Sequence, residues 1–212
     1  MKPSQSCPEY SEAISVRKMR ESDAYTIANI TDSITLMYRA AMGIYNSVCW
    51  ESKKIAIVCG SGNNGGDGYA LGCILADRGI YPHIYCVSDK FSCDGRYYFE
   101  LAVSKGTEVF SFDEKADFSS YDIVVDCLLG TGFEGSPRGN VHDAIVEINF
   151  SGAFVVSADI NSGINGDTGE AVCAVRSDPT VSIGYFKKGM FLNDAPSLIG
   201  DLVNVDIGIK LI

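Results

Sequence analysis

The sequence predicts an α/β protein with a Rossmann-like three-layer sandwich, in which helices cover both faces of a mostly parallel sheet. Short apolar segments typical of strands alternate with segments of helical spacing from residue 54 onward, which is the order of elements in doubly wound parallel sheets. Several strand segments, such as 55–58 and 123–125, are apolar at every position, as expected when helices cover both faces of the sheet.

The N-terminal quarter of the chain predicts two helices behind a short leader. Residues 1–14 begin polar and acidic, and we expect them to form a loose leader. From residue 16 to about residue 49 apolar side chains recur at helical spacing, while the sequence TDS at 31–33 interrupts the pattern and offers an N-cap. One helix should therefore lie on each side of this break.

The remainder of the chain predicts the sheet and the helices that cover it. We expect strands at 54–59, 82–87, 107–112, 121–128, 153–160, 179–185 and 201–207. We expect helical segments near 68–79, 94–105 and 140–150. No repeat, low-complexity segment or linker divides the sequence, so residues 1–212 should form a single domain.

Charge and composition argue against several functions. The formal net charge is −10 and Lys and Arg form no cluster, which argues against nucleic-acid binding. No apolar stretch reaches the roughly 20 residues of a membrane span, and the N-terminus has no apolar signal region. The eight cysteines form no C-x-x-C pair, several lie in apolar runs, and two histidines are too few to suggest a zinc site. Buried thiols in a reducing compartment are the better interpretation, so we expect a cytoplasmic protein.

The most informative segment is CGSGNNGGDG at 59–68, between the first predicted strand and a helical run. It satisfies the dinucleotide-binding pattern G-x-G-x-x-G, in which a helix N-terminus binds phosphate. Asn63, Asn64 and Asp67 add oxygen atoms to the same segment, and a carboxylate there would repel a phosphate. Either Asp67 points away, or a cation is part of the site.

Two more glycine-rich segments follow later strands, at 126–139 and at 159–169, and each begins with an aspartate. The carboxyl ends of parallel strands meet at one edge of a sheet, where such folds bind ligands. Three carboxylate-bearing loops at this edge predict a polar crevice that tolerates cations.

Three motifs in this order resemble the NAD(P)HX epimerase (YjeF N-terminal) family: NNGGDG, then D-x-x-x-G-T-G from Asp126, then D-I-x-S-G-x-x-x-D-T-G from Asp159. The likeness spans about residues 15–209, including the helical opening and the segment around Lys187. Tyr38 and Ala41 stand where the family commonly has Glu and Gly. This departure leaves open whether that segment lines a pocket and whether the chain forms a homodimer.

The resemblance implies a Rossmann-like fold that binds hydrated nicotinamide dinucleotides, NADHX and NADPHX, together with a potassium ion. It implies interconversion of their R and S forms at C6 of the damaged ring, a step of nicotinamide cofactor repair. Carried over by position, the dinucleotide contacts are Asn63, Asn64, Gly65, Gly66, Asp67, Gly130, Thr131, Gly132, Phe133, Glu134, Gly135, Ser136 and Asp159. The positions associated with potassium are Asn64, Asp126 and Ser162.

The chemistry of such a reaction suits these residue types. The hydrated ring is a hemiaminal, and inversion at C6 requires loss of water to an iminium or opening of the ring to an aldehyde. Both routes move a proton on or off oxygen, a task worth about 10²–10⁴ in rate for a positioned carboxyl group. Asp159 is the candidate acid/base. Potassium among Asp126, Asn64 and Ser162 would be a hard ion among oxygen ligands, and would offset charge near the pyrophosphate.

Structural explanations exist for each of these side chains. Asp126 could cap the following turn, and Asp159 and Asp167 could be Asx-turn residues. Asp67 at a helix start is favourable to the helix dipole whatever its function. Lys187 could be an ordinary hairpin lysine or could reach a phosphate.

Two other functions compete with the epimerase. A classical dehydrogenase would need a substrate domain and a proton relay, and Asp89 after the second strand is its only support, at the place of a ribose-binding acid. A non-catalytic nucleotide-binding or scaffold module of the same fold would be expected to lose the loop carboxylates, which this chain retains.

Overall fold

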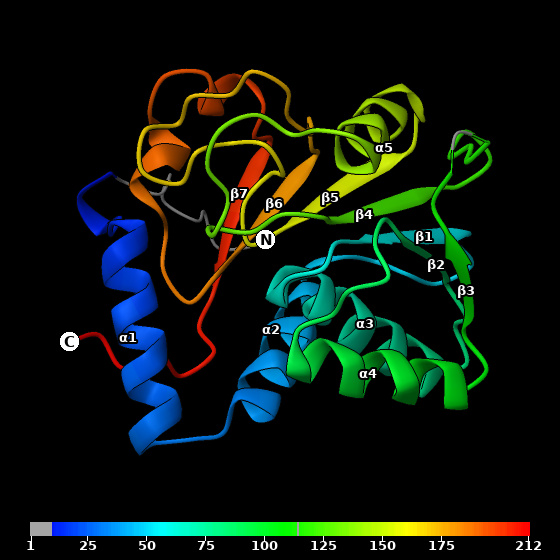
Figure 1. Ribbon diagram of the computed structural model, residues 1–212, viewed down its shortest axis with the longest axis horizontal. Helices are drawn as coiled ribbons and strands as arrows, with labels where there is room; N and C mark the ends of the chain where they lie inside the picture. The colour runs from blue at the N-terminus through cyan, green and yellow to red at the C-terminus, as the bar shows by residue number, and fades with distance from the viewer. Residues whose placement is uncertain (1–9, 114) are drawn as a thin grey trace, which may run out of the picture.

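The computed structural model describes residues 10–113 and 115–212, and within them the chain forms a seven-stranded sheet of order β3-β2-β1-β4-β5-β6-β7 (Figure 1). The strands are β1 (Ile55–Cys59), β2 (His83–Cys86), β3 (Glu108–Ser111), β4 (Ile123–Cys127), β5 (Phe154–Ala158), β6 (Pro179–Ile183) and β7 (Asp201–Val205). Every neighbouring pair is parallel. All seven carboxyl ends therefore lie at the same edge of the sheet.

Helices cover both faces of the sheet. They are α1 (Val16–Asn29), α2 (Ser33–Ser47), α3 (Asn63–Ala76), α4 (Cys93–Ser104) and α5 (Asn140–Phe150), with short 3-10 helices at Tyr10–Glu12, Lys188–Phe191 and Ala195–Ser197. In Figure 1, α2, α3 and α4 lie together on one face, α5 lies on the other, and α1 stands at the β7 side of the molecule. The predicted three-layer α/β architecture is confirmed, and its sheet is parallel throughout.

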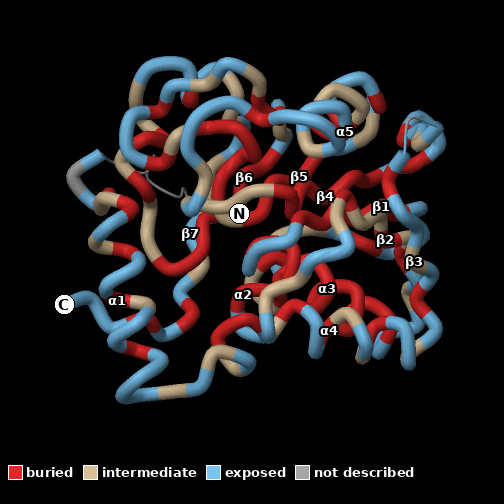
Figure 2. Tube along the Cα trace, viewed as in Figure 1, coloured by how far each residue is buried: buried red, intermediate tan, exposed pale blue. Residues whose placement is uncertain are grey.

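Neighbouring residues of β1 explain why the central strands are apolar at every position. Ile57 and Cys59 belong to the core cluster that holds the α2, α3 and α4 side chains, whereas Ala56 and Val58 pack with Ala144 and other residues of α5. Successive side chains of a strand point to opposite faces, so a sheet covered on both sides needs apolar residues throughout. Figure 2 shows these central strands as buried.

The seven predicted strands and five predicted helices all form, and the clearest difference is the start of α3. The glycines before residue 68 predict a loop because glycine has a low helix propensity, yet α3 begins at Asn63. Close packing explains the difference. A Cβ on Gly65 would lie 2.0 Å from the carbonyl oxygen of Gly60, and one on Gly68 would lie 2.7 Å from Cys59 Sγ. These glycines let the first turns of α3 approach β1 and the loop that follows it.

The expected leader is only partly described, since residues 1–9 lie outside the described residues. Tyr10–Glu12 form a 3-10 helix, and Ile14 pairs with Lys187 in an isolated parallel bridge. The Ile14 amide donates to the Phe186 carbonyl oxygen at 2.9 Å. The expectation of a loose segment is therefore wrong for residues 10–14, because residues 10–12 form a helical turn and backbone hydrogen bonds hold Ile14 to the chain after β6.

Within the described residues, no helix is both long and apolar enough to cross a bilayer. The seven described cysteines carry free thiols. Cys59, Cys73 and Cys127 are buried as the sequence predicts, whereas Cys49 and Cys93 are exposed. Cys7 lies outside the described residues.

Candidate active site

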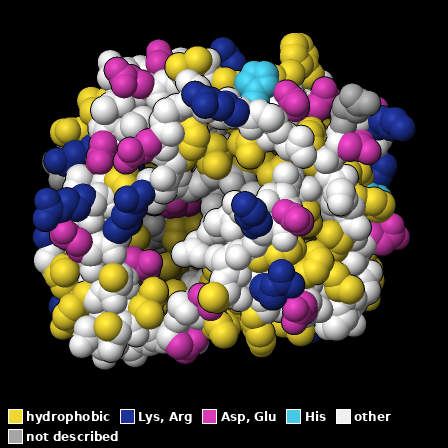
Figure 3. All heavy atoms as spheres, in the orientation of Figure 1, with side chains coloured by type: hydrophobic (Ala, Val, Ile, Leu, Met, Phe, Trp, Pro, Cys, Tyr) yellow, Lys and Arg dark blue, Asp and Glu magenta, His cyan; other side chains and the backbone are white. Residues whose placement is uncertain are grey.

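A cavity of about 660 Å³ opens at the carboxyl edge of the sheet, between α1 and the start of α3. Its volume lies within the range of small-molecule and cofactor sites. Most of its lining comes from α1, the first half of α2, the segment from Ser61 to Asp67, and the loops after β4 and β5. Asp94 of α4, Ile183 of β6, and Ile207 and Ile209 after β7 complete it. Figure 3 shows this face hollowed, with acidic and hydrophobic side chains inside the hollow. The cavity lies where the sheet order reverses between β1 and β4, the usual ligand position in such sheets.

The N-terminus of α3 contributes backbone amides to this cavity. Gly62 is the N-cap and makes no side-chain capping bond. Ser61, Gly62, Asn63 and Asn64 all line the cavity. The first amides of a helix have no partner within the helix and form a site for anions. The position predicted to bind phosphate therefore faces the cavity.

Two of the predicted dinucleotide contacts, Gly65 and Gly66, do not line the cavity. Gly65 packs on Gly60, and a Cβ on Gly66 would lie 2.5 Å from the terminal methyl carbon of Met37. Their side of α3 faces the protein interior. Only their backbone amides remain available to a ligand, and the Gly66 amide already donates to Gly62 at 3.2 Å.

Asp67 lines the cavity one turn into α3, with 9% of its surface exposed. Burial raises the pKa of Asp67 well above its ordinary value, and the nearby Asp159 and Asp23 carboxylates raise it further, while Lys187 opposes them. Asp67 lies four residues after Asn63, the first residue of α3, and these four residues span about 6 Å along the helix axis. Asp67 therefore does not share the position of a phosphate at the helix start.

The three residues associated with potassium meet around the backbone of Leu129. Asn64 Nδ2 donates to the Leu129 carbonyl oxygen at 2.9 Å, and Ser162 Oγ accepts from the Leu129 amide at 2.8 Å. Ser162 Oγ also donates to Asp126 Oδ1 at 2.5 Å. Asn64 Oδ1 is buried and has no hydrogen-bond partner among the described residues. An oxygen in that condition needs a donor or a cation.

Asp126 is fully buried, and its carboxylate accepts four hydrogen bonds from the protein. The donors are the Leu128 amide at 3.2 Å, the Ser157 hydroxyl at 2.9 Å, and the Ser162 amide at 2.9 Å and hydroxyl at 2.5 Å. Burial raises its pKa, and these hydrogen bonds act in the opposite direction. Asp126 thus ties the loops after β4 and β5 together, as well as closing the turn that follows it.

Asp159 lies at the end of β5 in the left-handed backbone region, with φ of 66°. Its Oδ2 accepts from the Thr131 amide at 3.2 Å, and its Oδ1 accepts from the ammonium group of Lys187. Lys187 is completely buried and also donates to the Ile183 carbonyl oxygen at 2.9 Å and to Ser182 Oγ at 3.3 Å. Lys187 is therefore neither an exposed hairpin lysine nor a direct phosphate ligand.

The segment 130–136 divides between two hollows. Gly130, Thr131, Gly132, Phe133 and Glu134 line the main cavity. Gly135 and Ser136 line a shallower neighbour with Arg138. A ligand that contacts all of 130–136 would extend from one hollow into the other.

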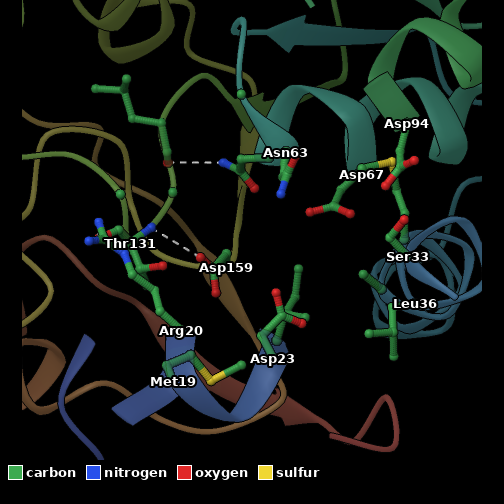
Figure 4. Close-up of a pocket in the computed structure, with 18 of the residues that line it drawn as sticks. Met19, Arg20, Asp23, Ser33, Leu36, Asn63, Asp67, Asp94, Thr131 and Asp159 are labelled. Carbon is green, nitrogen blue, oxygen red and sulfur yellow. Dashed lines mark hydrogen bonds between the residues drawn. The ribbon is translucent and has the colours of Figure 1, made fainter. Parts of the chain in front are cut away.

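The sequence did not identify two residues of this site, Asp23 and Arg20, and it left the role of a third, Lys187, open. Asp23 and Arg20 of α1 line the cavity, and Lys187 lies beneath Asp159. Met19, Asp23 and Ile27 recur at helical spacing and all line the cavity. Their spacing places them on one face of α1, but it does not indicate which part of the protein that face meets. Figure 4 shows Asp23, Asp67 and Asp159 pointing into one space from three different elements.

An all-parallel sheet in this order, with a ligand cavity at the end of β1, defines a Rossmann-like protein. The chain belongs to the family described as "YjeF-related protein N-terminus", whose sequence model matches residues 33–189. The crystal structure of yeast ynu0 has the same fold, with a TM-score of 0.76 over 88% of this chain and 84% of that chain at 20% identity.

Curated relatives match nearly the whole chain. A protein of Oenococcus oeni named NAD(P)H-hydrate epimerase is 33% identical over 204 residues, which cover 92% of this chain and 96% of that protein. One of the same name from Limosilactobacillus reuteri (strain DSM 20016) is 32% identical over 90% of this chain and 92% of that protein. A Coxiella burnetii protein named bifunctional NAD(P)H-hydrate repair enzyme Nnr is 29% identical, and the match covers 41% of its length.

Proposed function

We propose that the protein is an NAD(P)H-hydrate epimerase, which interconverts the R and S forms of NADHX and NADPHX at C6 of the hydrated nicotinamide ring. The similarity over nine-tenths of the chain to proteins of that name carries the proposal. The geometry supports it, since one cavity gathers the three carboxylate-bearing segments. The activity is an isomerisation without net redox change.

The dinucleotide would lie along the carboxyl edge of the sheet. Its pyrophosphate suits the uncapped N-terminus of α3, where Asn63 and Asn64 line the cavity. The segment 130–134 lines the opposite side, with the Arg20 guanidinium 3.5 Å from the Thr131 carbonyl oxygen. Arg20 is the basic side chain among the residues that line this cavity. Asp89, which a dehydrogenase would use for ribose, is exposed and does not line it.

Asp159 is the residue we assign to proton transfer at C6. Its carboxylate lines the cavity, and two donors from separate elements fix both of its oxygens. A carboxylate held in one orientation can exchange a proton with the C6 hydroxyl or with water in either direction. Fixed geometry of this kind lowers the cost of reaching the transition state.

The donor set fits a potassium ion. Asn64 Oδ1 is a buried oxygen with no partner within residues 10–113 and 115–212, and the Asp126 and Ser162 oxygens lie in the same network. Asn64 and Ser162 would hold the ion, and Asp126 would join them by giving up one of its four hydrogen bonds. The ion would supply positive charge beside the pyrophosphate in a cavity that carries five acidic residues: Asp23, Asp67, Asp94, Glu134 and Asp159.

The direct test is to mix the purified protein with (R)-NADHX and to follow the ratio of R to S by chromatography. Equilibration much faster than the spontaneous background, without change in total NADHX, is the expected result. Equilibration at the background rate would contradict the proposal and favour a non-catalytic nucleotide-binding or scaffold module. The same assay with (R)-NADPHX measures whether the second substrate is accepted.

A further inference from the structure

Asp67 is a cavity carboxylate that the proton transfer assigned to Asp159 leaves unused. It is buried except for 9% of its surface, and that remainder faces the cavity. Figure 4 shows Asp67 on α3 pointing into the cavity and Asp159 on its opposite side. No hydrogen bond from the described residues lowers the pKa of Asp67.

Lys187 and Asp159 form a buried ion pair. Its ammonium group has no exposed surface, and its partners are Asp159 Oδ1, the Ile183 carbonyl oxygen and Ser182 Oγ. A buried ammonium without a counter-charge is strongly destabilising. Asp159 is the anion in contact with it, so Asp159 rests as a carboxylate.

The surroundings of Asp67 favour its protonated form. Asp159 after β5 and Asp23 on α1 face it with like charge, and the thiols of Cys59 on β1 and Cys127 on β4 lie close enough to interact with it. Lys187 is the cation that acts on it, and Asp159 already pairs with that cation. Burial and like charge both raise the pKa of Asp67. Asp67 therefore holds its proton more tightly than an ordinary aspartate does.

We propose that Asp67 is a second catalytic residue, which donates a proton to the C6 hydroxyl from one side of the ring while Asp159 accepts a proton on the other side. Lys187 is the positioning residue that keeps Asp159 ionised and oriented. This inference rests on the proposed epimerase function. Two carboxyl groups whose environments favour opposite charge states are a recurrent basis for acid and base roles in one site.

The step balances in protons and electrons. Asp67 gives its proton to the C6 hydroxyl, the C6–O bond breaks with its electron pair on the leaving water, and the N1 lone pair forms a C6=N1 iminium. Water then adds to the opposite face, the π electrons return to N1, and Asp159 takes a proton from the incoming water. Water relays this proton back to Asp67. One water leaves and one enters, so the product is the other epimer.

The first experiment compares pH profiles of kcat/KM for the wild type, Asp67→Asn and Asp159→Asn. The wild type should show a bell, and each variant should be at least about a hundredfold slower. Asp67→Asn should lose the limb on which activity falls as pH rises, because that limb reports loss of the donor's proton. Asp159→Asn should lose the acidic limb. The reverse pattern would overturn the assignment.

Asp23→Asn is the matched control, since it removes another carboxylate from the same cavity. It should retain both limbs of the profile. An equal loss of rate and of the alkaline limb in Asp23→Asn would show that cavity charge alone matters, and would overturn the proposal. In H₂¹⁸O each inversion should place one solvent oxygen at C6, and retention of the original oxygen would also overturn it.

An infrared or ¹³C carboxyl titration of the ligand-free protein separates this inference from the proposed function. At neutral pH the wild type should show a protonated carboxyl signal that Asp67→Asn removes. A signal that survives in Asp67→Asn, or no such signal in the wild type, would overturn the charge assignment even if the enzyme is active. If the wild type lacks epimerase activity, the proposed function fails, whatever the titration shows.

Discussion

Asp159 is held by its backbone as well as by its side chain. Its φ of 66° lies in the left-handed region, which asparagine and aspartate occupy more readily than most residues. The Thr131 amide and the Lys187 ammonium then fix its two oxygens. Asparagine is therefore the substitution that removes the charge and leaves the backbone undisturbed.

Asp159→Asn should lower kcat by at least about a hundredfold, the low end of general acid–base contributions. Dinucleotide affinity should change little, because asparagine keeps the size of the side chain and an oxygen for the Thr131 amide. Steady-state kinetics and binding measured by calorimetry check both expectations. A loss confined to binding would mean that Asp159 only orients the ligand.

Asn64 is the residue whose substitution tests the cation. Its Oδ1 is buried and has no partner in the part of the chain that the structure describes, and the neighbouring Asn63 also lines the cavity. Asn64→Ala should abolish any difference in dinucleotide affinity between potassium and lithium buffers, whereas Asn63→Ala should retain it. Affinity that is independent of the salt in the wild type would contradict the potassium proposal.

At the scale of elements, α3 determines the geometry of the site. Helix glycines normally destabilise a helix by about 1 kcal/mol relative to alanine. Here they are required, because Gly65 packs on the Gly60 carbonyl oxygen and Gly68 on Cys59. The helix can then begin at Asn63, which places its first amides and Asp67 at the same cavity.

Gly65→Ala should destabilise the protein despite its better helix propensity. The new Cβ would lie 2.0 Å from the backbone oxygen of Gly60, and overpacking of this kind costs about 1–3 kcal/mol. Gly62→Ser is the matched control, because the space beside Gly62 is open and the position is the N-cap. Thermal unfolding should show a lower Tm for Gly65→Ala and an unchanged or higher one for Gly62→Ser. Equal Tm values would contradict the packing explanation.

At the scale of the whole molecule, the fold concentrates negative charge at one edge of the sheet. Asp23, Asp67 and Asp159 come from α1, α3 and the end of β5, and meet in one cavity. Holding buried carboxyl groups near one another lowers the stability of the folded protein at pH values where they ionise. Functional sites often retain such a cost.

This cost predicts how stability depends on pH. The folded protein binds a proton at Asp67 more tightly than the unfolded chain does, because the pKa of Asp67 is raised well above its ordinary value. That contribution is complete below about pH 4, and it is lost as the pH rises through the raised pKa. Asp67→Asn should therefore raise the free energy of unfolding at pH 8.

Denaturant unfolding from pH 4 to pH 9 measures this dependence. The wild type should lose stability relative to Asp67→Asn as the pH rises, and the two curves should converge at the acid end. Asp122→Asn removes an exposed aspartate and controls for net charge. A difference between wild type and Asp67→Asn that is constant with pH would contradict the raised pKa.

The sequence alone determined the class of fold, the order of its elements and the three carboxylate-bearing segments. Apolar periodicity reports which residues are buried, and parallel strands place the following loops at one edge, so these features are local or follow from topology. The same reasoning places Asp126, Asp159 and Asn64 at that edge, whereas the resemblance to the family supplied their roles.

Only the tertiary structure decided what those residues contact. Lys187 is buried against Asp159, and α1 brings Asp23 to the cavity, so segments far apart in the chain meet there. The structure also showed that Asn64 Oδ1 is buried with no hydrogen-bond partner among the described residues. The helical start of α3 likewise depends on how closely Gly65 meets Gly60. Burial and contact across long sequence separations set the charge state and orientation of a side chain, and neither quantity is encoded in local spacing.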